Sequence, residues 1–198
     1  RIGQTGENSA TPEKVTVSNV VVNSGATLTL RPVSPEFWDG PELIVQEVNG
    51  AGKIQLAKVG IKANYVGDNA ECMINVAEIE MLPVTRWNNE IDSWLDGKSD
   101  EDKFMVVNSA VIGTGRFYTH GNVTLNGDVA MSREFKMDSE NASVKTVILD
   151  GGWVSSENLG GIEKLAFHSG TYDCADYTDK TWPLYLDGGT VSVGDGTA

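Results

Sequence analysis

Hydrophobic and polar residues alternate through short phrases of this chain, and glycine or asparagine separates one phrase from the next. In VTVSNVVVNSGATLTL, from Val15 to Leu30, valine and leucine alternate with threonine and serine on both sides of Asn23-Ser24-Gly25. A period of two places the apolar side chains on one face, which predicts short β-strands with one face to bury. Similar phrases continue to about position 82, return after Phe104 and end in GGTVSVGDGTA.

The glycine-led phrases also recur along the chain. Strands are expected to open near Gly121, Gly152 and Gly189, at intervals of 31 residues from Gly121 to Gly152 and 37 from Gly152 to Gly189. Loose spacing with constant chemistry is typical of a solenoid with loops of different size at one corner. A coil of short strands must stack on the next, about 4.8 Å away, to cover its apolar face. We therefore predict an all-β parallel β-helix, or β-solenoid, with residues 1–198 forming one domain.

An antiparallel β-sandwich or jelly roll is the alternative, because it also has short strands with turns every 8 to 12 residues or so. The two cysteines bear on the choice. In a solenoid, the residues from Cys72 to Cys174 would span several coils, which exceeds the limit of about 7 Å between the Cα atoms of a disulfide. A bridge would favour the sandwich, whereas two buried thiols fit the solenoid.

The segment TRWNNEIDSWLDGKSDEDK breaks the pattern of alternation. Its apolar residues Trp87, Ile91, Trp94 and Leu95 fall at i, i+4, i+7 and i+8, which is the stripe of an amphipathic helix. We expect a helical insertion at about 87–103, laid against the β framework with both tryptophans pointing inward.

The phrases VVVNSGATLTL, GNVTLNGDV and LDGGTVSVGDG resemble the parallel β-helix passenger domains of bacterial autotransporters and related surface adhesins. The resemblance covers residues 15–82 and 104–197, and the helical insertion and the cysteines depart from it. It implies a secreted or cell-surface stalk or binding module, and it implies no catalytic residue. The ending lacks the polar cap that normally closes a solenoid. We therefore expect either a fragment of a longer chain or self-association through the open ends.

Charge narrows the choice of partners. The chain has 28 acidic and 15 basic residues and a formal net charge of -13, which repels phosphate backbones and anionic lipid headgroups. It also lacks the run of about 18 apolar residues that a membrane-spanning helix requires. We expect neither nucleic acid binding nor membrane insertion.

Aromatic residues near the end of the chain form one candidate binding site. Tyr177, Trp182 and Tyr185 lie in a turn-rich segment with carboxylates nearby, and such rings stack on the C–H faces of sugars. The alternative is burial of these rings under a corner loop. The sequence thus names a glycan or another surface ligand as a partner.

Acidic residues in the same region form a candidate metal site. Asp173, Asp176 and Asp179 could bind calcium through carboxylate oxygens, but their spacing differs from that of an EF-hand loop. A solvated acidic loop is the alternative. We expect no other cofactor.

No motif assigns a catalytic residue. Glu78 and Glu80 face the same side of a predicted strand, as the carboxylates of a glycosidase would, but a solvated face in an acidic protein explains them equally. His120 has no second metal ligand nearby, and we expect it on the surface.

Three functions are compatible with these features. The first is a non-enzymatic extracellular structural or adhesive module, self-associating end to end. The second is a polysaccharide-active, lyase-like β-helix enzyme, for which calcium and a base such as Arg116 or Arg133 would be needed. The third is a sugar-binding β-sandwich.

Overall fold

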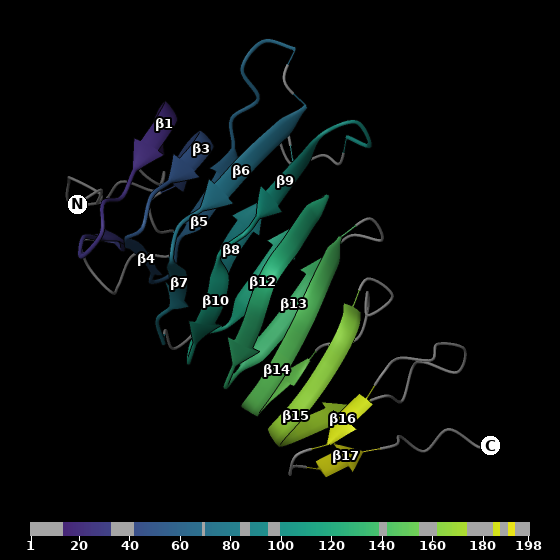
Figure 1. The fold of residues 1–198 in the computed structure, drawn as a ribbon. Coiled ribbons are helices and arrows are strands. Elements are labelled where there is room, and N and C mark those ends of the chain that lie inside the picture. The colour runs from purple at the N-terminus through teal and green to yellow at the C-terminus, as the bar shows by residue number, and fades with distance from the viewer. Residues whose placement is uncertain are drawn as a thin grey trace.

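The structure is a computed structural model of the 198-residue chain. It describes residues 14–32, 42–68, 70–83, 88–94, 100–138, 142–154, 162–173, 184–186 and 190–192. Within these ranges all regular structure is β-strand, and 17 strands form one sheet (Figure 1). The strands are β1 (Lys14–Val21), β2 (Thr27–Leu30), β3 (Glu42–Asn49), β4 (Lys53–Leu56), β5 (Gly60–Ala63), β6 (Glu71–Asn75), β7 (Glu78–Met81), β8 (Asn89–Asp92), β9 (Phe104–Val107), β10 (Ala110–Gly113), β11 (Phe117–His120), β12 (Val123–Met131), β13 (Glu134–Asp138), β14 (Ser143–Val154), β15 (Ile162–Asp173), β16 (Leu184–Leu186) and β17 (Thr190–Ser192).

Every pairing between these strands is parallel. The parallel part of the prediction is thus confirmed, and the antiparallel β-sandwich or jelly roll is wrong for the part of the chain that the structure describes. The arrangement is consistent with a β-solenoid-like fold. Within the described ranges, no helix has the length and apolar character needed to cross a membrane.

The strands fall into three rows, which the chain visits in turn. Row A contains β1, the first half of β3, β5, β8, β11 and β13, followed by the ends of β14 and β15 and by β17. Row B contains the second half of β3, β6, β9 and the beginnings of β12, β14 and β15. Row C contains β2, β4, β7, β10, the end of β12, the middle of β14 and β15, and β16. One passage through A, B and C is a coil, and each coil lies on the one before it (Figure 1).

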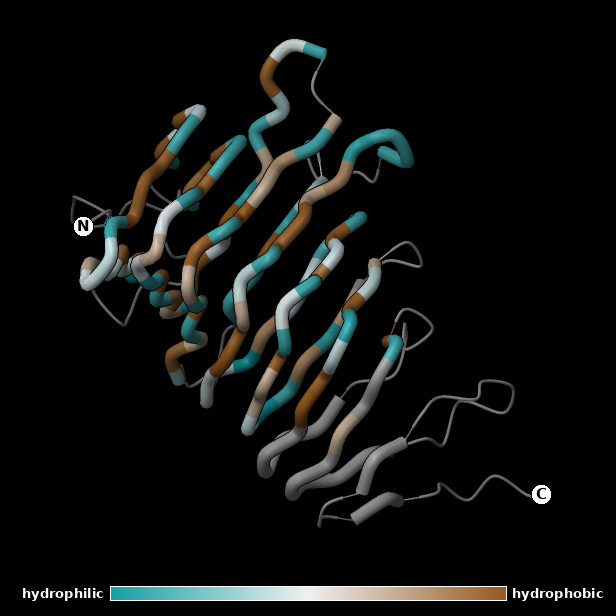
Figure 2. The backbone as a smooth tube through the Cα atoms, in the orientation of Figure 1, coloured by the Kyte–Doolittle hydropathy of each residue, from teal (hydrophilic) through white to brown (hydrophobic). Residues whose placement is uncertain are grey.

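The core consists of aliphatic side chains stacked from coil to coil. In row C, a single inward column passes through Leu28, Ile54, Ile79, Val111, Val129 and Val147. The last five of these side chains are fully buried, and burying such a side chain stabilises the fold by about 1.5–3 kcal/mol. Phe117 and Phe135 stack in the same way in row A, with ring centroids 5.3 Å apart. Figure 2 shows the resulting alternation of apolar and polar positions along the strands.

The register reveals the true repeat length. Val111 pairs with Val129, Val129 with Val147 and Val147 with Leu165, so each of these coils contains 18 residues. Gly152 pairs with Gly170, which is also 18 positions later. The interval of 37 residues inferred from the sequence therefore spans about two coils. The interval of 31 residues joins positions that are not equivalent, because Gly121 lies at a corner and Gly152 lies within β14.

The coils differ mainly at the corner between rows A and B. Two residues separate β11 from β12, whereas seven separate β5 from β6 and eleven separate β8 from β9. The strands on either side keep their register across these differences. Extra length in a coil therefore leaves the stack at a corner and does not disturb the rows.

The predicted helical insertion is wrong where the structure describes it. Asn89–Asp92 is strand β8, which pairs with β5 on one side and β11 on the other. The backbone gains two parallel neighbours there, and Ile91 enters the core between Ile61 and Thr119. These tertiary contacts outweigh the helical spacing of the apolar residues, because local pattern is only a weak prior. Residues 84–87 and 95–99, including Trp87 and Leu95, lie outside the described ranges.

Cys72 is a buried free thiol on β6, in register with Met105 of row B. Burial raises the pKa of this thiol to about 11. The expectation of a buried thiol is confirmed for Cys72, while Cys174 lies outside the described ranges.

Candidate functional site

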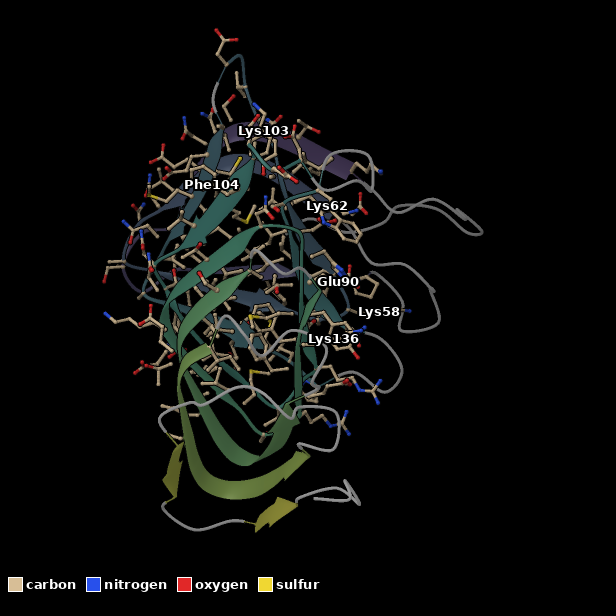
Figure 3. The ribbon with its side chains drawn as sticks, turned by 90° about the vertical axis from the view of Figure 1, so that its right-hand side faces the viewer. Lys58, Lys62, Glu90, Lys103, Phe104 and Lys136 are labelled. Atoms are coloured by element: carbon tan, nitrogen blue, oxygen red, sulfur yellow. The ribbon has the colours of Figure 1, made fainter. Side chains whose placement is uncertain are left out.

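The outward side of row A carries a ladder of charged and aromatic side chains. Outward positions alternate along each strand, and parallel pairing places equivalent positions beside one another. In one column Lys62 pairs with Asp92 and Asp92 with His120, and in the next column Glu90 pairs with Tyr118 and Tyr118 with Lys136. Figure 3 shows Lys62, Glu90 and Lys136 along one side of the stack. We call this set the row A ladder, and its members are Lys14, Glu42, Lys62, Glu90, Asp92, Tyr118, His120 and Lys136.

The first part of the ladder is a chain of ion pairs across three coils. Glu42 lies 3.1 Å from the Nζ atom of Lys14 and 2.9 Å from that of Lys62. The Nζ atom of Lys62 also lies 3.6 Å from a carboxylate oxygen of Asp92. The Lys62 stem passes beside Gly60, where a Cβ atom would lie 3.9 Å from Cε of Lys62. One ammonium group therefore joins carboxylates from the coils on both sides.

Burial and charge oppose each other in this group. Burial raises the pKa of the Glu42 carboxyl, but hydrogen bonds and charge from Lys62 and Lys14 outweigh it, so the pKa is lowered. Burial likewise lowers the pKa of Lys62, and Glu42 with Asp92 and Glu90 raises it above its usual value. Burial dominates at Asp92, whose pKa is raised despite the hydrogen bond from the N–H of Trp94 and the charge of Lys62. The ion pairs thus favour the charged forms of Glu42 and Lys62 but not that of Asp92.

The second part of the ladder is aromatic. The His120 ring lies 5.3 Å from the Trp94 ring and 6.5 Å from the Tyr118 ring, measured between centroids, and both pairs are tilted. The Nε2 atom of His120 lies 3.7 Å from a Glu90 carboxylate oxygen. The Nζ atom of Lys136 lies 6.0 Å from the centroid of the Tyr118 ring. Aromatic rings, a carboxylate and a cation are therefore gathered on three successive strands, β8, β11 and β13.

Trp94 fixes the edge of this aromatic group. It follows β8 at the corner between rows A and B, where its N–H donates to Oδ1 of Asp92 over 2.8 Å. A Cβ atom at Gly121 would lie 2.3 Å from the indole Cδ1, so the ring packs directly on that glycine. The indole Nε1 is buried and has no hydrogen-bond partner among the described residues. Trp94 thus lies at the corner against the next coil, and not in the core as the predicted helix required.

Burial also affects the Tyr118 hydroxyl. Burial raises the pKa of Tyr118 to about 12, and the Glu134 carboxylate contributes in the same direction. The hydroxyl therefore remains a neutral hydrogen-bond donor at physiological pH. A neutral phenol beside Glu90 and Lys136 can bind a polar ligand, but it is poorly suited to accept a proton.

The residues considered for catalysis are used in contacts between coils. Glu78 lies 2.6 Å from the Nζ atom of Lys53, and a carboxylate oxygen of Glu80 accepts a 2.8 Å hydrogen bond from Gln55. The Nε atom of Arg116 lies 3.6 Å from a Glu134 oxygen. Glu78 and Glu80 do share the outward side of β7, as predicted, since Ile79 between them is buried. Across the described ranges, no group of three or more His, Cys, Asp or Glu side chains is placed to hold a metal ion.

The binding residues predicted near the end of the chain lie mostly outside the described ranges. This applies to Tyr177, Trp182, Asp176 and Asp179. The backbone of Tyr185 belongs to β16 and pairs with Ala166, and that of Asp173 ends β15 opposite Ser192. The aromatic sugar-binding patch and the calcium site therefore stay predictions.

The row A ladder was missed from the sequence because its members are far apart. Glu90 and Tyr118 are 28 positions apart, and Tyr118 and Lys136 are 18 positions apart, yet they lie side by side. Only a coil length measured strand by strand would have aligned them. His120, expected on the surface, ends strand β11 with a side chain that is 19% exposed.

No family model matches the chain, and neither does any curated protein or solved structure. The likeness to passenger domains therefore rests on the sequence phrases, together with an all-β architecture whose strands are parallel. The function has to be argued from the surfaces of the stack.

Proposed function

We propose that the chain forms a β-solenoid and acts as a non-enzymatic structural or adhesive module outside the cell. The observation that carries the proposal is the unbroken parallel register of three strand rows through successive coils. Hydrogen bonds in such a stack run along its axis, and each coil completes the edge of its neighbour. This construction suits a stiff support that holds a surface at a distance.

The outward ion pairs support a structural role. Lys62 joins Glu42 to Asp92, and Lys53 binds Glu78 in row C, in each case between neighbouring coils. Charges paired along the axis add to the hydrogen bonds between coils. The repeated use of the same direction favours a scaffold, because a reaction centre would require charges that converge on one point.

The aromatic part of the row A ladder supports an adhesive role. Trp94, Tyr118 and His120 offer flat rings, and Glu90 and Lys136 add an acceptor and a donor. Rings of this kind stack on the C–H faces of sugars while polar neighbours bind the hydroxyls. A glycan is the partner that fits this combination best.

The lyase-like alternative has no observation in its favour among the described residues. Its candidate base Arg116 is paired with Glu134, and the two glutamates of β7 are bound to Lys53 and Gln55. The sugar-binding β-sandwich is overturned by the parallel strand pairing. The end-to-end self-association inferred from the sequence stays a prediction, because residues 1–13 and 193–198 lie outside the described ranges.

A glycan array tests the adhesive and non-enzymatic parts together. The full chain should bind a subset of immobilised glycans, and Tyr118→Ala should lower the affinity at least about tenfold by removing a stacking ring. Thr16→Ala, an outward and exposed change on β1 of the same row, is the matched control and should bind normally. Each variant is first compared with the parent in urea unfolding.

Product analysis gives the opposing result. The glycans that bind are incubated with the chain, and new reducing ends and unsaturated sugars are measured with and without calcium. Cleavage would overturn the non-enzymatic proposal, and failure to bind any glycan would overturn the adhesive one. Antibody labelling of intact source cells tests the proposed location, since labelling that requires permeabilisation would contradict it.

A further inference from the structure

A polar hollow lies on the other side of the stack from these rings, on the outward face of row C. Its volume is about 410 Å³, and it is lined by Thr27, Thr29, Arg31, Gln55 and Leu82. These residues belong to β2 and β4, to the segment that follows β2 and to the segment that follows β7. Small-molecule sites typically have volumes from about 300 to 1,000 Å³, so the hollow is large enough for a small ligand.

A directed chain of hydrogen bonds forms one wall of the hollow. The Nε2 atom of Gln55 donates to a carboxylate oxygen of Glu80 over 2.8 Å, and Oε1 of Gln55 accepts from the Thr29 hydroxyl over 3.1 Å. An ionised carboxylate only accepts, so Glu80 fixes the orientation of the Gln55 amide. The amide in turn uses the only hydrogen of the Thr29 hydroxyl. Thr29 is therefore left with acceptor lone pairs, which bind a ligand hydroxyl group.

Arg31 provides the opposite character in the same hollow. Its side chain is exposed and makes no ion pair with any described residue, in a chain of formal net charge -13. A guanidinium group offers five N–H donors in a planar fork that matches a carboxylate. A cation left unpaired in so acidic a protein is available for an anionic ligand.

The other two lining residues suit a sugar ring. The Thr27 hydroxyl makes no hydrogen bond with a described residue and can donate or accept, since its position on β2 is exposed. The half-buried Leu82 adds an apolar surface for C–H groups. The hollow thus combines one cationic fork, two hydroxyls, one oriented amide and one apolar contact.

We propose that the row C hollow binds a hydroxylated carboxylate, and specifically the acidic sugar unit of a glycan. Its carboxylate binds Arg31, one of its hydroxyls donates to Thr29, and its ring lies near Leu82. This site does not involve the row A ladder, and it adds a second ligand class to the module proposed above.

Calorimetric titration of the full chain with matched ligands tests the proposal. Methyl glucuronide should bind with a Kd on the order of 1 mM, because the contact area is small and one charged fork contributes most. Methyl glucoside, which has a hydroxymethyl group in place of the carboxylate, should bind at least about tenfold more weakly. Glycerate distinguishes a small free hydroxy acid from a sugar unit and should also bind at least about tenfold more weakly.

Variants identify the site. Arg31→Gln should weaken methyl glucuronide at least about tenfold without changing the affinity for methyl glucoside. Thr29→Val should weaken both sugars several-fold, because it removes the acceptor that both use. Lys53→Gln removes a cation from the same row that is paired with Glu78, and it should change neither affinity. Urea unfolding of each variant confirms that the fold is retained.

Several results would overturn the inference. These are equal binding of glucoside and glucuronide, glycerate binding as tight as that of glucuronide, an unchanged affinity in Arg31→Gln, and no glucuronide binding at about ten times the expected Kd. Tyr118→Ala separates this site from the proposed adhesive surface. It should leave glucuronide binding intact, and its loss there would place the ligand on row A.

Discussion

The backbone N–H of Lys58 donates a 2.8 Å hydrogen bond to Oδ1 of Asn89, 31 positions further along the chain. The Nδ2 group of Asn89 donates to the carbonyl oxygens of Leu82 and Arg116, over 3.2 and 3.1 Å. These three partners lie at the corners between rows C and A in successive coils. Asn89 is fully buried, so a single side chain satisfies backbone groups of three turns that water does not reach.

Replacing Asn89 should therefore destabilise the fold strongly. Asn89→Leu removes all three bonds and leaves the Lys58 N–H and two carbonyl groups without this partner, which should cost about 2–4 kcal/mol in the free energy of unfolding. Urea unfolding followed by circular dichroism measures the loss. Asn126→Ala is the control, because the Asn126 amide binds only the exposed side chain of Asn108, and it should change stability by less than about 0.5 kcal/mol. Equal losses in the two variants would contradict this role of Asn89.

Lys62 should contribute more to stability than another paired lysine. Lys62→Met leaves Glu42 and Asp92 without their shared cation, and we expect a loss of about 1–2 kcal/mol because the group is half-buried. Lys53→Met breaks the pair with Glu78 on the exposed side of row C, where solvent screens the charges, and it should leave the free energy of unfolding almost unchanged. Urea midpoints in low and high salt compare the two variants. A loss in Lys53→Met as large as that in Lys62→Met would refute this ranking.

The stability contributed by Glu42 should depend on pH in a defined direction. Its pKa is lowered in the folded chain, so this stability is complete above the unfolded value of about 4.3 and is lost as pH falls through the lower folded value. Glu42→Gln should thus be less stable than the parent at neutral pH, and the gap should close in acid. Unfolding midpoints measured from pH 7 down to the acid limit of folding follow this gap.

Asp92 should show the opposite sign. Its pKa is raised in the folded chain, so its charged form destabilises the fold above that pKa, and the penalty disappears as pH falls towards the unfolded value of about 3.9. Relative to the parent, Asp92→Asn should gain most at neutral pH and least in acid. The same titration measures it, and parallel curves for the Glu42 and Asp92 variants would contradict the two assignments.

Gly50 should be the least replaceable glycine of the corner between rows B and C. It has a φ of 125°, and a Cβ atom there would lie 2.1 Å from the carbonyl oxygen of Val22 in the preceding coil. Gly50→Ala combines backbone strain with a clash, and we expect a loss of at least about 3 kcal/mol. Gly25→Ala has a positive φ of 75° but open space around the new atom, and it should cost only about 1 kcal/mol. Similar midpoints in thermal unfolding would contradict the expected difference.

The sequence predicted the strand content and the parallel stacking well, because both follow from local features. Alternation from Val15 to Leu30 marks one buried face, and a face so narrow requires neighbours above and below it. The helix over 87–103 failed at Ile91 for a physical reason. Its spacing fits a helix in isolation, but β5 and β11 provide backbone partners that no local pattern contains. The coil length was also inaccurate, since turns of similar composition occur at positions that are not equivalent.

The candidate sites depended on knowledge of the register. Glu90, Tyr118 and Lys136 lie side by side only because the corner after β8 contains eleven residues and the one after β11 contains two. Arg31 and Gln55 meet for the same reason, across the pairing of β2 with β4. A sequence shows which side chains are available, but their neighbours depend on loop lengths that must be counted coil by coil.

The unequal corners between rows A and B separate novelty from durability. The strands that bear the load keep one constant repeat, while the intervening segments change length without shifting any strand pair. Mutation can therefore explore new recognition loops at this corner while the architecture that supports them remains intact. An engineer could use the same corner as a grafting point for a foreign peptide.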